Sequence, residues 1–346
     1  ILDIIKKELL EIKEAYSDKR KTEIIEAEAS NFEMEDIMEE SNCVITVTHS
    51  GYIKRQPLQT YRQQRRGGKG LVATTTKEED FVREIFIAST HSYILLFTSK
   101  GRVHWVKVYD IPDASRQARG KAIVNLLNLQ SNEKVTAHIP IKKFDPNKFL
   151  IMVTRNGIIK KTSLDSYSNP RRGGIAAITL GPDNKLINVK LTSGDKEIIL
   201  ATRNGIAVRF NENDVRATGR SSQGVKGIRL SENDQVIGMV VATDEKTLLT
   251  VTENGYGKRT KISEYRLISR GGSGVRNIVC SERNGKVVSI NSVSSENQIM
   301  MITKKGITIR MPVSQISVIG RATQGVRLIK LHENDQLVSV AKIVKE

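Results

Sequence analysis

The sequence has little of what several functions require. Among its 346 residues are two cysteines, Cys43 and Cys280, one tryptophan and only 5% aromatic residues. Two cysteines so far apart suggest neither a disulfide framework nor a zinc site, and they suit a reducing cytoplasm. Proteins that bind single-stranded nucleic acid usually stack bases on aromatic side chains. The scarcity of aromatic residues therefore favours contact with the backbone of a duplex.

A long apolar run is also missing. The sequence contains no stretch of 18 apolar residues and no secretory leader. We therefore expect a cytoplasmic protein that neither spans nor crosses a membrane by its own signals. The chain begins at Ile1 inside a helical pattern, so we expect it to be a piece of a longer polypeptide.

Positive charge is abundant and unevenly distributed. The formal net charge is +17, but residues 1–40 hold 6 Lys or Arg against 13 Asp or Glu. The remaining residues hold 49 against 25, a net charge of +24. A folded body this basic favours a polyanionic partner, which is either nucleic acid or an acidic membrane surface.

Glycines repeat with a period near fifty residues. Each repeat has a turn glycine after a strand-like run, and a second glycine follows after 19 residues, or 17 in the third repeat. The turn glycines are Gly51, Gly101, Gly157, Gly205, Gly255 and Gly306. The second glycines are Gly70, Gly120, Gly174, Gly224, Gly274 and Gly325. Such a period predicts a radial β-array, because one repeat cannot bury its apolar face without its neighbours.

The repeats predict an all-β, propeller-like disc. Runs such as Ile198–Thr202 end at Asn-Gly, which favours a type I′ hairpin with two positive φ angles. A later apolar pair follows an acidic turn, which gives about four short strands and one blade per repeat. Three segments result: the end of an upstream helix at 1–17, an acidic connector at 18–42, and a six-bladed body at 43–346.

Cations recur at two fixed positions of the repeat. Four residues after the turn glycines lie Arg55, Trp105, Lys161, Arg209, Arg259 and Arg310. Four residues before the second glycines lie Arg66, Arg116, Pro170, Arg220, Arg270 and Arg321, and the shortened third repeat has Arg171 and Arg172 nearby. One interpretation pairs these cations with acidic turns of neighbouring blades. The net charge exceeds what such pairs could neutralise, so we expect a curved positive track on the rim.

A curved track of this kind suits double-stranded DNA. Bending a short site by 40–90° costs on the order of 1–6 kcal/mol. Neutralising roughly 6–10 phosphates releases enough counterions to offset that cost at low salt. Contacts to phosphates carry no sequence information, so we expect bending or wrapping with weak sequence preference.

The first repeat alone contains the sequence QRRGGKG, which is Gln64, Arg65, Arg66, Gly67, Gly68, Lys69 and Gly70. In a six-repeat basic β-array this motif resembles the GyrA box, and the chain is similar throughout to the C-terminal domain of bacterial DNA gyrase A subunits. The resemblance implies a six-bladed β-pinwheel that wraps DNA and enables ATP-dependent negative supercoiling. It also implies that the box residues are the most sensitive to substitution.

The resemblance implies partners and a set of contact residues. The partners are double-stranded DNA and, in an A2B2 assembly on the bacterial chromosome, the gyrase B subunit with the rest of the gyrase A subunit. ATP and Mg would be bound outside this chain, which by itself is expected to be monomeric and free of cofactors and metals. Later repeats retain partial forms of the box, such as Arg119-Gly120-Lys121. The expected DNA contacts are Arg55, Arg65, Arg66, Lys69, Arg116, Arg119, Lys121, Lys161, Arg171, Arg172, Arg209, Arg220, Arg259, Arg270, Arg310 and Arg321.

Three alternatives remain at this point. The A-type subunit of topoisomerase IV is the nearest relative, but its array is typically shorter and lacks an intact box. A propeller can also be a protein-interaction platform, whose binding would survive high salt. An enzyme site in the central channel would need converging carboxylates or histidines. None of the eight tyrosines, including Tyr61 and Tyr109, has the sequence context of a DNA-cleaving nucleophile, and no P-loop is present. We therefore expect a non-catalytic part of an enzyme. The acidic residues of the connector could also compete with DNA for the basic rim.

Overall fold

The computed structural model describes residues 1–18, 37–48, 50–58, 82–115, 118–127, 129–130, 132–171, 173–305 and 307–343. The chain divides into two compact units, Ile1–Glu39 and Glu40–Glu346. The first contains the expected helix, α1 (Leu2–Tyr16), which has no buried residue. Most of the predicted connector, 19–36, lies outside the described residues. Within the described part of the chain, no helix has the length and apolar character needed to cross a membrane.

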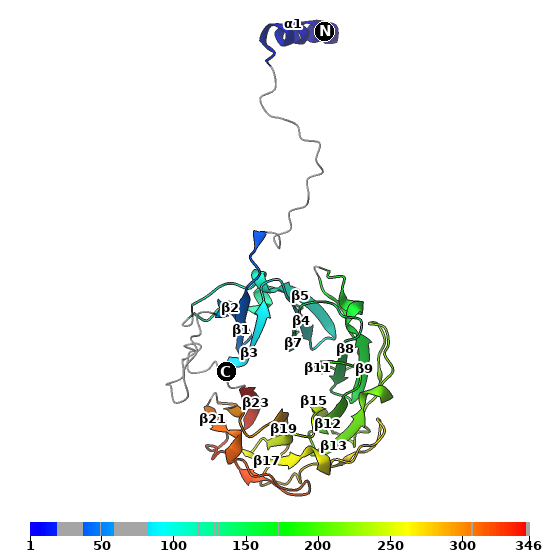
Figure 1. Cartoon of the computed structure of the whole chain (residues 1–346), viewed down its shortest axis with the longest axis vertical. Coiled ribbons are helices and arrows are strands. Elements are labelled where there is room, and N and C mark those ends of the chain that lie inside the picture. The colour runs from blue at the N-terminus through cyan, green and yellow to red at the C-terminus, as the bar shows by residue number, and fades with distance from the viewer. Residues whose placement is uncertain are drawn as a thin grey trace. The chain divides into compact units, whose positions relative to one another are not determined.

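The second unit is a ring of six antiparallel sheets (Figure 1). The strands of each blade are given from the inner to the outer one. Blade one contains β3 (Val82–Ser89), β1 (Asn42–Thr48), β2 (Tyr52–Pro57) and β6 (Lys121–Ala122), and blade two contains β7 (Val135–Ile141), β4 (Tyr93–Thr98), β5 (Arg102–Lys107) and β10 (Ile175–Ala176). Blade three contains β11 (Leu186–Thr192), β8 (Phe149–Thr154), β9 (Ile158–Ser163) and β14 (Val225–Lys226).

The other three blades continue the same order around the ring. Blade four contains β15 (Val236–Ala242), β12 (Glu197–Thr202), β13 (Ile206–Asn211) and β18 (Val275–Arg276). Blade five contains β19 (Val287–Val293), β16 (Thr247–Thr252), β17 (Tyr256–Lys261) and β22 (Val326–Arg327), and blade six contains β23 (Leu337–Ile343), β20 (Gln298–Thr303) and β21 (Thr308–Pro312). Short 3-10 helices follow the third strand of blades two to six: η2 (Val108–Asp110), η4 (Leu164–Tyr167), η5 (Glu212–Asp214), η6 (Ile262–Glu264) and η7 (Val313–Gln315). Another, η3 (Ile123–Asn125), follows β6. The predicted six-bladed, four-stranded architecture is confirmed.

Neighbouring blades exchange their outermost strands. β6, β10, β14, β18 and β22 each belong to one repeat but complete the sheet of the preceding blade. We call these junctions the first to fifth seams, numbered by the blade that receives the strand. The sheet of blade six has three described strands. The corresponding segment of the first repeat follows Gly70 and falls in 59–81, outside the described residues.

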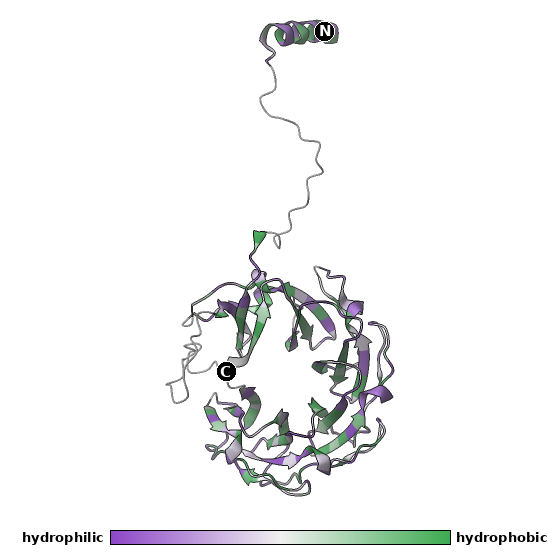
Figure 2. Cartoon of the chain, in the orientation of Figure 1, coloured by the Kyte–Doolittle hydropathy of each residue, from purple (hydrophilic) through white to green (hydrophobic). Residues whose placement is uncertain are grey.

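Each blade packs its two faces against its two neighbours. In β4, Ile94 and Leu96 pack with the core of blade one, whereas Leu95 and Phe97 pack with blade three. Alternate side chains of a strand point to opposite faces, so an unbroken apolar run is what such a doubly buried strand requires. Figure 2 shows this hydrophobic character on the strands nearest the centre. A single repeat therefore has no complete core of its own.

The hairpin turns differ from the prediction. The connection from β8 to β9 has three residues, and the amide of Gly157 donates to the Thr154 carbonyl at 3.0 Å. Gly157 has φ of 77°, while Asn156 is not among the residues with positive φ. The predicted type I′ turn is therefore wrong, since only the glycine adopts the left-handed conformation. The geometry fits a type I turn followed by a left-handed glycine.

The second glycine of repeats two to six allows the outermost strand to approach the preceding blade. A Cβ built on Gly274 would lie 2.5 Å from the Ala207 carbonyl oxygen, and on Gly224 it would lie 2.6 Å from that of Ile159. Both glycines also have positive φ, 72° and 89°. Only glycine satisfies both conditions, which explains the repeat of this residue in the sequence.

Candidate nucleic-acid interface

Three of the cations four residues after a turn glycine lie inside the seams, not on the rim. Lys161, Arg209 and Arg259 are 6%, 9% and 7% exposed. Lys161 Nζ donates to the Glu212 carbonyl at 3.0 Å, and Arg259 Nε donates to the Ile316 carbonyl at 2.7 Å. These carbonyls belong to the 3-10 helix of the next repeat or to the residue after it, where backbone acceptors lack helical partners.

Arg209 shows the most complete version of this arrangement. Its Nη1 donates to the carbonyls of Ile262 and Tyr265 at 3.0 and 3.3 Å. Its Nη2 lies 2.5 Å from a carboxylate oxygen of Glu197 and 2.9 Å from one of Asp244. Glu197 lies on β12 of the same blade and Asp244 in the turn from blade four to blade five, so Arg209 meets the alternative of pairing with acidic turns of neighbouring blades only through Asp244. Backbone carbonyls satisfy most of the series.

Trp105, which interrupts the cationic series, has the same structural role. Its indole Nε1 donates to the Tyr167 carbonyl, at the end of η4, at 2.9 Å. Arg55 is half-buried, and its backbone amide donates to the Pro112 carbonyl. Arg310, in the last repeat, is exposed and bonds Gln298 of its own blade at 2.5 Å. Position in the ring therefore decides whether this residue is buried.

The residue before this position includes lysines that sequence analysis missed. Lys54, Lys160 and Lys258 are at most 1% exposed. Burial and, to a lesser degree, Arg220 lower the pKa of Lys160 to about 8. Burial likewise lowers the pKa of Lys258 to about 8; Arg321 lowers it further, whereas Glu264 raises it. The sequence signal that could have found them is a lysine at this position in every second repeat. The repeats between them have His104, Val208 and Ile309 there.

The cations four residues before the second glycine lie on half-exposed loops that cover the seams. The side chains in question, those of Arg220, Arg270 and Arg321, are all half-exposed. Arg270 donates to the backbone carbonyls of Asp214 and Lys226. Arg116 and Arg172 lie outside the described residues, as does the whole of Gln64–Gly70. Arg65, Arg66 and Lys69 therefore keep the role given to them by resemblance alone.

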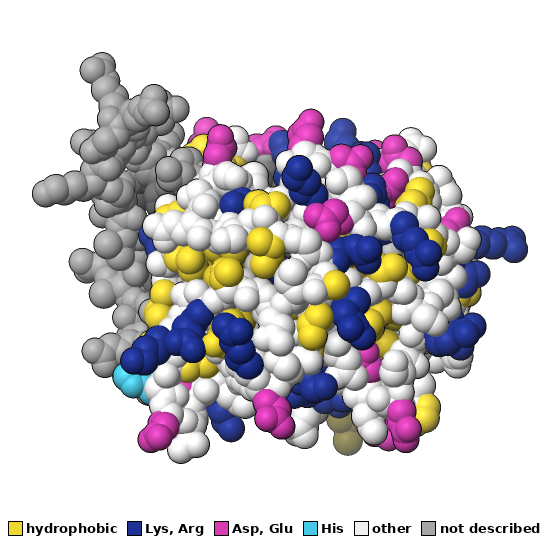
Figure 3. All heavy atoms as spheres, turned by 90° about the horizontal axis from the view of Figure 1, so that it is seen from below, with side chains coloured by type: hydrophobic (Ala, Val, Ile, Leu, Met, Phe, Trp, Pro, Cys, Tyr) yellow, Lys and Arg dark blue, Asp and Glu magenta, His cyan; other side chains and the backbone are white. Residues whose placement is uncertain are grey.

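The outermost strands carry the exposed cations of the rim. Lys121, Lys226, Arg276 and Arg327 lie on β6, β14, β18 and β22, and all four are exposed. Three of them occur two residues after the second glycine, a position that sequence analysis did not single out. Arg119 and Arg171 are exposed in the adjoining loops. Figure 3 shows Lys and Arg side chains across the middle of the ring's edge, with Asp and Glu mostly toward its margins.

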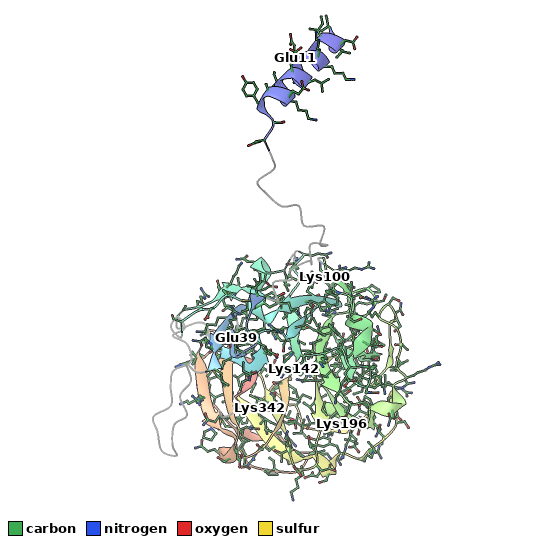
Figure 4. The ribbon with its side chains drawn as sticks, turned by 45° about the horizontal axis from the view of Figure 1, so that its top comes forward. Glu11, Glu39, Lys100, Lys142, Lys196 and Lys342 are labelled. Carbon is green, nitrogen blue, oxygen red and sulfur yellow. The ribbon has the colours of Figure 1, made fainter. Side chains whose placement is uncertain are left out.

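Other lysines lie near the centre of the ring. Figure 4 shows Lys142 and Lys342 there, after β7 and within β23. The pKa of Lys342 is lowered by burial and then by Lys246 and Lys190. Lys142 and Lys342 are therefore separate from the cations of the rim, which lie on the outermost strands. Within the described ranges, no cluster of three or more His, Cys, Asp or Glu side chains is placed to bind a metal.

A comparison with known families decides the relationship. The sequence matches the family described as "DNA gyrase C-terminal domain, beta-propeller" six times, at residues 44–89, 92–142, 148–193, 196–243, 246–294 and 297–343. The chain belongs to this family. It is 54% identical over 343 residues to the DNA gyrase A subunit of Halalkalibacterium halodurans, covering 99% of this chain and 41% of that protein. It is 49% identical to the corresponding Clostridium acetobutylicum protein, covering 100% of this chain and 42% of that one.

The gyrase C-terminal domain fold is also found among solved structures. A gyrase A C-terminal domain aligns with a TM-score of 0.68 and 27% identity, covering 88% of this chain and all of that one. A topoisomerase IV C-terminal domain aligns with a TM-score of 0.78 and 28% identity, covering 88% and 94%. The chain spans about two fifths of the length of the gyrase A subunits that it matches.

Proposed function

We propose that this gyrase C-terminal domain binds duplex DNA along its rim and bends or wraps it without sequence preference. The observation that carries the proposal is the row of exposed cations on the outermost strands, Lys121, Lys226, Arg276 and Arg327. These strands complete blades one, three, four and five, so the cations follow the curve of the ring, although β10, which completes blade two, carries none. A curved row of positive charges can contact more phosphates of a bent duplex than of a straight duplex.

The free energy gained from phosphate contacts favours wrapping of the duplex over docking of a straight duplex. Each phosphate neutralised releases counterions and contributes a slope of about −0.9 to the dependence of log affinity on log salt. Several such contacts offset the ~1–6 kcal/mol needed to bend a short duplex. We therefore expect tight binding at low salt that weakens steeply as salt increases.

The larger role follows from the family. In the whole gyrase, the wrapped DNA would be presented for strand passage, so that ATP hydrolysis introduces negative supercoils. This chain would supply the wrapping surface. The remainder of the A2B2 gyrase in the bacterial cytoplasm, formed by the B subunit with the rest of the A subunit, would supply DNA cleavage and the ATP and Mg sites.

The test is ligation of nicked circular DNA saturated with the chain, followed by protein removal and measurement of linking number. We expect a shift for the unmodified chain and a smaller one for Lys226→Gln/Arg276→Gln. A matched control is Lys142→Gln, which removes an exposed charge near the centre of the ring. An Arg65→Ala/Arg66→Ala/Lys69→Ala variant tests the box separately. Tight, salt-sensitive binding without any shift would refute wrapping and leave a DNA-docking module.

The topoisomerase IV alternative has one observation in its favour, the higher TM-score. Sequence identity is higher to the gyrase A subunits, at 54% and 49%. Joining the chain to the catalytic part of a gyrase A subunit distinguishes the two. Restored ATP-dependent negative supercoiling would support the gyrase role, and relaxation alone would support the alternative.

A further inference from the structure

The five seams are of two kinds. In the first, third and fifth seams a lysine, Lys54, Lys160 or Lys258, is buried beneath the loop that precedes the second glycine of the next repeat. In the second and fourth seams, His104 and Val208 occupy the same position. The five described seams therefore alternate between those with and those without a buried ammonium group.

The buried lysines bind the carbonyls of the covering loops. Lys258 Nζ donates to the carbonyls of Gly320 and Arg321, both at 2.5 Å. Lys160 Nζ donates to the Arg220 carbonyl of its covering loop and, at 2.7 Å, to the Ala177 carbonyl of its own repeat. The loop is thus bonded from below, through its backbone, without using its own side chains.

Lys54 repeats the pattern in the first seam. Its Nζ donates to the carbonyls of Ser115 and Ala118 at 3.2 and 3.0 Å. Arg116, which corresponds to Arg220 and Arg321, lies between these two residues and outside the described ones. The comparison of side chains therefore rests on the third and fifth seams.

Seams without a lysine use an arginine at the surface instead. In the fourth seam, Arg270 Nε donates to the Asp214 carbonyl at 2.8 Å, and its Nη1 donates to the Lys226 carbonyl at 3.2 Å. In the second seam, Arg102 Nη2 donates to the carbonyls of Gly173 and Gly174 at 2.7 and 3.0 Å. These guanidinium groups already have backbone partners.

The corresponding guanidinium groups of the lysine seams do not. Among the described residues, the guanidinium groups of Arg220 and Arg321 make no hydrogen bond or ion pair. The like charge of the ammonium group below opposes an inward position of the arginine, and Arg220 and Arg321 in turn lower the pKa of Lys160 and Lys258. Arg220, Arg270 and Arg321 occupy the same position of the repeat, so the difference comes from the residue beneath.

We propose that the buried lysines leave Arg220 and Arg321 available for phosphates, so that at this position of the repeat DNA is contacted at alternate seams, whereas Arg270 is mainly structural. The inference rests on the proposed function of the rim. A free guanidinium group can donate two parallel hydrogen bonds to a phosphate without losing an internal contact. Arg270 would have to give up its carbonyls first.

The test compares single substitutions at the same position of three repeats. Arg220→Gln and Arg321→Gln should each lower the salt slope by about 0.9 and duplex affinity by roughly tenfold at low salt. Arg270→Gln should leave both nearly unchanged and instead lower the urea midpoint of unfolding. Equal losses of affinity in all three variants would overturn the inference. If the unmodified chain does not bind duplex DNA at all, the proposed function fails instead.

A double-mutant cycle tests the part of the lysine. In Lys258→Met the like charge beneath the loop is removed, so Arg321 can turn inward as Arg270 does; affinity should fall nearly as far as in Arg321→Gln, and combining the two should add little. Additive losses would show that the lysine does not act through Arg321. The cycle is repeated with Lys160 and Arg220, which keeps the test available if one lysine variant does not fold.

Discussion

The ring carries two populations of repeating cations that differ in what surrounds them. Arg209 and Arg259 lie inside seams with backbone carbonyls as partners, whereas Arg276 and Arg327 lie exposed on the outermost strands. Both populations recur in most repeats and consist of the same residue types, although Trp105 interrupts the first and β10 carries no cation. Periodic charge alone therefore does not identify a binding surface. Whether nearby carbonyls lack partners decides which cations are structural.

The largest loss of stability should come from replacing one of the buried cations. Arg209→Met leaves the Ile262 and Tyr265 carbonyls without their donor and Glu197 without its partner. The free energy of unfolding should fall by about 3 kcal/mol, measured by urea denaturation.

The matched control for this substitution is Arg310→Met. Arg310 occupies the same position of the last repeat but is exposed, and among the described residues its side chain bonds only Gln298. Its loss should change stability by less than about 0.5 kcal/mol. Similar effects of the two substitutions would mean that the seam contacts do not distinguish them.

A smaller effect should follow from crowding a seam. Gly274→Ala combines a φ of 72° with a Cβ only 2.5 Å from the Ala207 carbonyl oxygen. The free energy of unfolding should fall by about 2 kcal/mol. Gly219→Ala is the control, because no atom lies within 4 Å of the added Cβ and φ is not positive. If both variants unfold at the same urea concentration, close approach at the seam does not explain the second glycine.

The last effect concerns pH. The pKa of Lys160 and Lys258 is about 8 in the folded protein, below the usual 10.5, because burial disfavours the charged form. The folded state then binds fewer protons than the unfolded state between these values, so stability should rise as pH increases through this window. Arg220 faces Lys160, and Glu264 and Arg321 face Lys258.

Urea midpoints measured across this pH window check the prediction. Lys160→Met/Lys258→Met should lose much of the rise, because the variant has no buried ammonium at these two sites. An unchanged rise in the variant would assign the pH dependence to other groups, such as Lys54 and Lys342, whose pKa values are also lowered.

Much of the fold could be predicted because the repeat is visible in the sequence. The six turn glycines set the number of blades, and the apolar runs before them set the strands. The turn type could not be predicted from Asn-Gly alone. That dipeptide fits more than one turn, and Asn156 does not adopt the positive φ that a type I′ turn needs.

The rim was predicted less well than the fold. Arg119, Lys121 and Arg171 are exposed as expected, but Lys161, Arg209 and Arg259 are buried. Lys226, Arg276 and Arg327 were missed because their strands are only two residues long and have no apolar pattern. Strand exchange brings these segments to the preceding blade, and nothing local to the repeat indicates that.

The sequence by itself determined the number of repeats, the blade architecture, the excess of positive charge and the family, because each depends on composition and spacing. The tertiary structure alone decided which cations face solvent. Lys258, Arg259 and Arg327 have similar side chains, yet the first two meet carbonyls of the next repeat and the third lies exposed on β22. The physical reason is that burial of a charge depends on the partners available around it, and here residues about sixty positions away supply those partners.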